Sequence, residues 1–132
     1  MTAFSNALEN EILSRYLKNT TAITPVATVY AALFTGTTTD ASQTEVPNSN
    51  NYSRQAISWG TVSAGSVSGP TTTLTFPQAS GSWGTITGFG IYDSGTHGSG
   101  NLLFWGNLSS SVAIGTNDRF EFAASAVTVS VD

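Results

Sequence analysis

The chain has 132 residues and no cysteine, which excludes disulfides and thiolate metal sites. Only 9% of its residues are charged, against about 25% in an ordinary soluble domain, and the net charge is −4. The four basic residues are scattered, so the clustered positive surface that nucleic-acid binding needs is excluded. No apolar run approaches the roughly 20 residues of a membrane helix, and the N-terminus lacks the basic start of a signal peptide. We therefore expect one domain over residues 1–132, made in the cytoplasm, with neither a membrane nor a nucleic-acid partner.

Hydroxyl side chains replace charge as the source of surface polarity. Serine and threonine make up 38 of the 132 residues, and no Asp, Glu, Lys or Arg occurs between Gln55 and Tyr92. Sparse charge weakens repulsion between copies, which favours a subunit that packs against its own kind or against a partner. The alternative is a β-protein that is merely rich in threonine.

The first predicted element is an amphipathic helix over residues 4–19. Ser5 is placed to cap its start, and the polar run after Asn19 followed by Thr24-Pro25 ends it. Four apolar residues recur every four positions: Phe4, Leu8, Ile12 and Tyr16. Two placements remain open for this stripe, since it can cover an end of the chain's own sandwich or dock on a neighbouring subunit.

The β-rich part is predicted over residues 26–132. Residues 26–34 are apolar on both faces and predict a central strand, whereas residues 35–51 are polar and predict a long exposed loop. Alternation or turn signals predict further strands over residues 52–59, 71–76, 85–92, 101–108, 119–122 and 127–131.

The later predicted strands are grouped by the turns between them. Residues 85–92 and 101–108 flank a glycine-rich connector and predict a hairpin with a long flexible tip, while residues 119–122 and 127–131 are expected to form the last pair. The inward positions of that last pair are expected to be Phe120, Phe122, Val127, Val129 and Val131. The pattern predicts a mainly β fold, a sandwich or jelly-roll-like domain of 7–8 strands with one N-terminal helix.

Catalytic chemistry finds little support in the sequence. His97 is the only imidazole, it lies in the predicted hairpin tip, and no Gly-x-Ser-x-Gly elbow accompanies it. Asp93, Asp118 and Glu121 are glycosidase candidates only by elimination. Acidic residues near position 40 lack the spacing of a calcium loop, and the glycine-rich segments at 65–69 and 95–100 are interpreted as turns. We expect no enzyme activity, no metal and no cofactor.

Carbohydrate binding is the stronger functional alternative. Exposed aromatic rings can stack on sugars, and the candidates are Trp59, Trp83, Trp105, Tyr52 and Tyr92. Aromatic residues within strands are more often part of the core, so this hypothesis depends on their exposure.

Several segments together resemble a known family. They are NALENEIL (6–13), PVATVY (25–30), ALFT (32–35), TEV (44–46), YSRQA (52–56), TFP (75–77), GSWGTIT (81–87), FGIYD (89–93) and GNLLF (100–104). In combination, and over nearly the whole chain, the sequence resembles small virion structural proteins of tailed phages. Members are often labelled tail fibre proteins and are also similar to capsid cement, or decoration, proteins of cyanophage-like particles.

The resemblance implies a location on the virion, on the head surface or on the tail, and it brings no catalytic residues. Because a fibre gains length through repeats, coiled coils or a β-helical shaft, which this sequence lacks, we expect a cement protein that bridges capsid subunits. Its expected partners are the major capsid protein and itself, as a homotrimer. A tail-fibre or tail-tip adhesion module that binds host polysaccharide is the alternative. Docking is expected through six residues: Phe4, Leu8, Ile12, Tyr16, Asp40 and Glu45.

Overall fold

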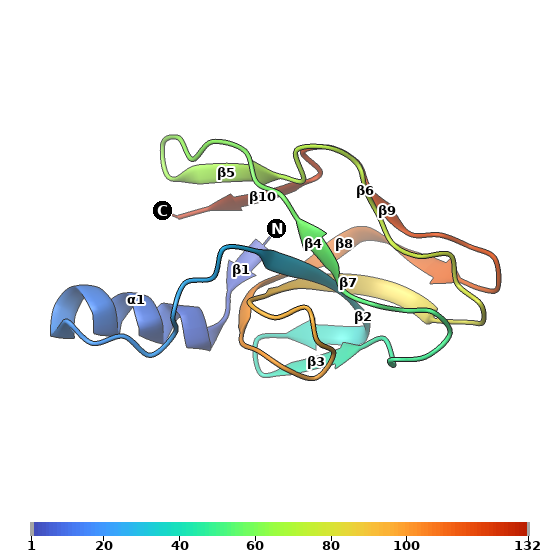
Figure 1. The fold of residues 1–132 in the computed structure, drawn as a ribbon, viewed down its shortest axis with the longest axis horizontal. Coiled ribbons are helices and arrows are strands. Elements are labelled where there is room, and N and C mark those ends of the chain that lie inside the picture. The colour runs from blue at the N-terminus through green and yellow to red at the C-terminus, as the bar shows by residue number, and fades with distance from the viewer. Residues whose placement is uncertain (1, 132) are drawn as a thin grey trace.

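A computed structural model of the protein describes residues 2–131, and this part of the chain contains ten strands and one helix (Figure 1). The helix is α1 (Asn6–Lys18). The strands are β1 (Thr2–Phe4), β2 (Val29–Thr39), β3 (Ser42–Glu45), β4 (Gln55–Ile57), β5 (Ser66–Gly69), β6 (Leu74–Thr75), β7 (Gly84–Tyr92), β8 (Leu102–Ile114), β9 (Glu121–Phe122) and β10 (Val127–Ser130).

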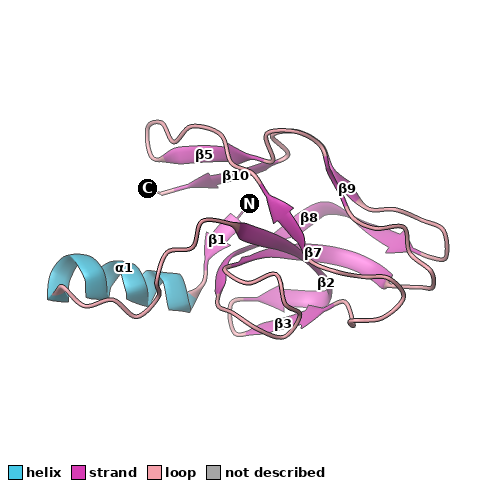
Figure 2. Ribbon diagram, viewed as in Figure 1, coloured by secondary structure: helices cyan, strands magenta, loops and turns pink. Residues whose placement is uncertain are grey.

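The strands form one large sheet and two small ribbons, all antiparallel. The large sheet has the order β1-β8-β7-β2-β3, and β4 pairs with the first residues of β2. The ribbons are β10-β5 and β6-β9, and they lie above the large sheet in the view of Figure 2. This arrangement confirms the predicted mainly β, sandwich-like fold with one N-terminal helix.

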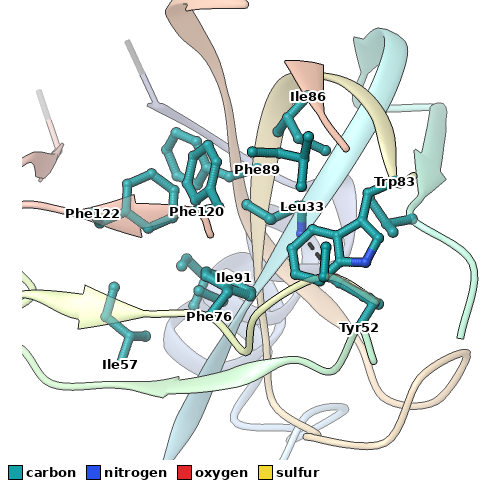
Figure 3. Packing of buried hydrophobic residues seen from close by; sticks show 14 of the residues in the cluster. Leu33, Tyr52, Ile57, Phe76, Trp83, Ile86, Phe89, Ile91, Phe120 and Phe122 are labelled. Atoms are coloured by element: carbon teal, nitrogen blue, oxygen red, sulfur yellow. Dashed lines mark hydrogen bonds between the residues drawn. The ribbon is translucent and has the colours of Figure 1, made fainter. Parts of the chain in front are cut away.

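The core lies between the large sheet and the ribbons. Leu33, Ile86 and Ile91 of β2 and β7 face the rings of Phe76 and Phe120, as Figure 3 shows. These aromatic rings contact one another edge to face, with 5.9 Å between the ring centroids of Phe76 and Phe120. Such contacts add to the stabilisation that burial of their apolar surface provides.

The central strand is confirmed, although it begins three residues later than predicted. Residues 31–34 of β2 are fully buried, because both faces of this strand are covered. The predicted hairpin is also confirmed, since β7 and β8 pair antiparallel around residues 93–101. Its β8 strand is longer than predicted and continues to Ile114.

Four other expectations are wrong. Residues 35–51 do not form one long loop, because β2 continues through a glycine to Thr39 and turns directly into β3. The last two strands do not pair with each other, since β9 pairs with β6 and β10 pairs with β5. Part of the segment interpreted as turns, residues 65–69, is the strand β5, because its residues pair with β10. Val131, expected to point inward, is exposed beyond the end of β10.

Candidate functional site

The helix α1 projects from one end of the sandwich, and the chain then returns alongside it to β2 (Figures 1 and 2). We call α1 together with this return segment, residues 19–28, the arm. Glu11 is the only buried residue of α1, so most of the helix surface faces solvent. The arm therefore adds little to the core, and the placement in which the helix stripe covers the sandwich is not the observed one.

The base of the arm is fixed to the sandwich by its first residues. The Ser5 side chain accepts a hydrogen bond from the Leu8 N–H, 3.2 Å, which confirms Ser5 as the N-cap. The Ser5 N–H and hydroxyl donate to the carbonyl oxygens of Leu103 and Leu102 in β8. The Asn6 N–H donates to a carboxylate oxygen of Asp40 at 2.9 Å. Contacts with two separate elements thus set the direction in which α1 leaves the body.

The return segment is tied to the helix by a buried carboxylate. Glu11 accepts hydrogen bonds from the N–H groups of Ala22 and Ile23, at 2.6 and 2.7 Å. It also accepts two from Arg15, one turn later, which in turn donates to the Ile23 carbonyl. The Ile23 N–H lowers the pKa of Glu11 below its ordinary value, against the opposing effect of burial. Glu11 stays ionised at neutral pH and holds the two halves of the arm together.

Large apolar side chains lie exposed along the outer face of α1. Leu13 is 55% exposed, Tyr16 79% and Leu17 77%. We call these three residues the ridge. Three neighbouring large side chains in water on one short helix are uncommon in a monomeric soluble protein, and such patches mark interaction sites.

A groove of about 300 Å³ runs between α1 and the return segment. Its lining is mainly apolar and consists of Leu8, Glu11, Ile12, Arg15, Tyr16, Ile23, Thr24, Pro25, Val26, Asp93 and Leu103. We call it the arm groove. Tyr16 belongs to both surfaces and stands between them, so the arm presents an apolar projection and an apolar depression side by side.

A second polar cluster surrounds Glu45 at the end of β3, the last strand in the order of the large sheet. Arg54 binds both oxygens of the Glu45 carboxylate, and the Tyr52 hydroxyl donates to one of them at 3.0 Å. The guanidinium of Arg54 lies 3.7 Å from the centroid of the Tyr92 ring. Burial raises the pKa of the Tyr52 phenol above its ordinary value, and the Glu45 charge raises it further.

The Glu45 cluster fastens the tip of the β7–β8 hairpin. Arg54 donates to the carbonyl oxygens of Ser94 and Ser99, both at 2.8 Å, and an imidazole nitrogen of His97 lies 2.9 Å from the Val46 carbonyl oxygen. The tip expected to be flexible is therefore held at both of its ends. The charged groups of Arg54 and Glu45 bind each other, and Arg54 also binds backbone carbonyls. We therefore call this cluster the clamp, since its contacts hold two parts of the fold together. Within residues 2–131, no three acidic or histidine side chains converge as metal ligands.

Comparison with known families identifies what kind of protein carries this arm. The family model of the podophage GP4 fiber I protein gp80 matches residues 3–130. The chain belongs to this family. A search of curated proteins finds no significant match. The gp80 family is one of phage virion fibre proteins, which confirms the resemblance to tail-fibre-like structural proteins.

The gp80-family match places the protein among structural components of a phage particle. In the part of the chain that the structure describes, no helix has the length and apolarity to span a membrane.

The six predicted docking residues separate into three groups in this gp80-family chain. Leu8, Ile12 and Tyr16 come together in the arm groove. Phe4 and Asp40 lie at the base of the arm, where the Phe4 ring packs edge-on against Phe104 at 5.0 Å. Glu45 lies apart from the arm in the clamp.

Sequence reasoning missed the residues that make the arm distinctive. The stripe predicted from the sequence consists of Phe4, Leu8, Ile12 and Tyr16, and it does not single out Leu13, Leu17 or Glu11. The sequence does contain a signal for these residues. Leu13 and Leu17 are four residues apart on the helix face opposite to the Glu11–Arg15 pair, and this spacing indicates two distinct helix surfaces.

The aromatic rings considered for sugar stacking are largely committed to the fold. Tyr52 and Trp83 are buried, and the Trp83 indole donates to the Asn50 carbonyl at 2.9 Å. Trp59 is half-buried against the core, Trp105 of β8 is also half-buried, and Tyr92 lies under the Arg54 guanidinium. These positions leave no row of exposed tryptophans for a sugar chain.

Proposed function

We propose that this gp80-family protein is a non-catalytic structural subunit of the podophage tail-fibre apparatus, held in the virion by its arm. The observation that carries the proposal is the exposure of the ridge on a helix that is itself firmly anchored. Ser5 and Asn6 fix its base and Glu11 fixes its return segment, so the ridge is presented in one defined orientation.

The energetics of the ridge favour attachment. Complete burial of a large apolar side chain stabilises an assembly by about 1.5–3 kcal/mol relative to leaving it in water. Leu13, Tyr16 and Leu17 are all more than half exposed, so each has most of this stabilisation still to gain. Because the arm is ordered by its own hydrogen bonds, docking requires little further loss of conformational entropy.

A head location is the second candidate. The described residues contain no helical or β-helical shaft, and a compact sandwich with a short arm also fits a cement protein seated on the capsid. The fibre role is preferred because it agrees with the description of the family.

The attachment role is tested by removing the ridge. A variant carrying Leu13→Ser, Tyr16→Ser and Leu17→Ser is expected to fold, since these side chains are exposed, but to be missing from purified virions. Val62→Ser is the matched control, because Val62 is 71% exposed on the body between β4 and β5. Incorporation is measured by quantitative blotting of particles, and the melting temperature of each purified variant reports folding.

Antibody labelling of the wild-type particle in electron micrographs gives the location. Label on the tail supports the fibre role, whereas label over the capsid shell favours the cement role and overturns the first choice. Normal incorporation of a folded ridge variant contradicts attachment through the arm at either location.

A further inference from the structure

The ridge and the arm groove are complementary surfaces of one arm. Leu13 and Leu17 project from α1, while Ile23, Val26 and Leu103 line the depression beside it. Both surfaces face water in a single copy, although burying one in the other would remove apolar area from each. The ridge cannot enter its own groove, because α1 itself forms one wall of that groove.

The charges around the two surfaces are complementary as well. Lys18 follows Leu17 at the end of α1 and makes no ion pair within residues 2–131. Asp93, on the wall of the arm groove, binds the backbone and side-chain amides of Asn101 at 2.6 and 2.8 Å but has no cationic partner in the same range. A ridge that enters the groove of another molecule brings an unpaired cation toward an unpaired carboxylate.

We infer that the arm groove receives the ridge of a second copy of this chain, so that the arms of neighbouring copies interlock. The inference rests on the proposed function, in which the arm is the attachment element, and adds the identity of its partner. A ring of three copies, the homotrimer expected from the sequence, uses each ridge and each groove once.

The contact is small, and its strength follows from its size. Three ridge side chains and a groove lined by eleven residues form a smaller interface than the roughly 20–30 residues per partner of a stable complex. We therefore expect weak pairing of free chains and firm pairing in the particle, where neighbouring copies are held at high effective concentration.

The absence of cysteine makes the contact directly testable by disulfide trapping. Leu17→Cys labels the ridge and Val26→Cys labels the groove, and both positions are exposed, so both full-length variants are expected to fold. Virions produced with the two variants together are oxidised and run on a non-reducing gel. We expect a covalent dimer in the mixture and none with either variant alone. Val62→Cys, on the body, replaces Val26→Cys as the control and is expected to give no product with the ridge variant.

The product pattern decides between this partner and others. A dimer of Leu17→Cys with itself reveals ridge-to-ridge packing and overturns the inference. Absence of any mixed product in intact virions also overturns it. Neither result touches the proposed function, because attachment through the arm is tested by incorporation of the ridge variant and the tail location by antibody labelling.

Discussion

Arg54 and Glu45 form a bidentate ion pair, Nε to Oε1 and Nη2 to Oε2, with both distances 2.8 Å. The Arg54 side chain is only 1% exposed, and its remaining nitrogen donates to the carbonyls of Ser94 and Ser99. One guanidinium thus joins the end of β3 to the tip of the β7–β8 hairpin. Arginine suits this position because its planar fork satisfies a carboxylate and two carbonyls at once.

Replacing Arg54 with alanine is expected to lower the free energy of unfolding by about 3–5 kcal/mol, since the Glu45 carboxylate is left partly buried without its cation. Denaturant unfolding measures the loss. The double variant Arg54→Ala/Glu45→Ala should lose less than the two single variants added together. Arg119→Ala is the exposed control, and an equal effect of both arginine substitutions would contradict the clamp.

Alkaline pH is expected to destabilise the fold through Tyr52. Burial and the Glu45 charge raise the pKa of Tyr52 in the folded protein. The contribution of Tyr52 to the free energy of unfolding is therefore complete below the pKa of the unfolded state, about 10, and is lost as the pH rises beyond that value. Tyr52→Phe should flatten this decline in melting temperature. At neutral pH the same variant should cost about 1–2 kcal/mol, because the Leu33 N–H loses its acceptor. A decline unchanged from wild type would exclude Tyr52 as its source, and Tyr16→Phe is the exposed control.

Acid is expected to loosen the arm. The pKa of Glu11 is lowered in the folded state by the Ile23 N–H, so its stabilising effect is present above the unfolded value, about 4.3, and is lost as the pH falls through the lower folded value. Amide exchange at Ala22 and Ile23 should accelerate below about pH 4, after correction for intrinsic rates. In Glu11→Gln these two amides should already exchange rapidly at neutral pH. Glu9→Gln, on the exposed face, should retain wild-type protection.

Gly90 is expected to resist substitution. A Cβ added there would lie 2.5 Å from the Phe34 ring and 2.8 Å from a Leu102 methyl group, both within the folded body. Gly90→Ala should therefore lower the free energy of unfolding by about 1–3 kcal/mol through overpacking. Gly115→Ala is the control, since its nearest neighbour would lie 3.6 Å away. Equal stability of the two variants, measured by thermal unfolding, would contradict this close packing.

Local signals predicted the regular elements well. The Ser5 cap, the end of the helix near Asn19 and the buried residues of β2 all follow from side-chain chemistry within a few positions. The β7–β8 hairpin follows from a glycine-rich connector between two apolar runs.

Non-local pairing and the arm lay beyond such signals. The strands β5 and β10 are about sixty residues apart, and the polar segment Ser66–Gly69 becomes a strand only because β10 lies beside it. The polar run after Phe34 similarly becomes strand because β3 and β7 pair with it. The apolar periodicity of α1 predicts which side chains share one face of the helix. It does not predict that Leu13 and Leu17 are exposed, because their exposure depends on where Ser5 and Asp40 anchor the helix to the sandwich.

The pairing of β1 with Phe104–Gly106 of β8 has a consequence for the order of events during synthesis. The first strand of the chain cannot find its partner until more than a hundred residues have left the ribosome. Until then α1 lacks its anchor on Leu102 and Leu103, and the ridge has no fixed orientation. The surface that we propose to contact neighbouring copies is thereby completed late, so nascent chains on one polysome are expected not to engage one another before each has folded.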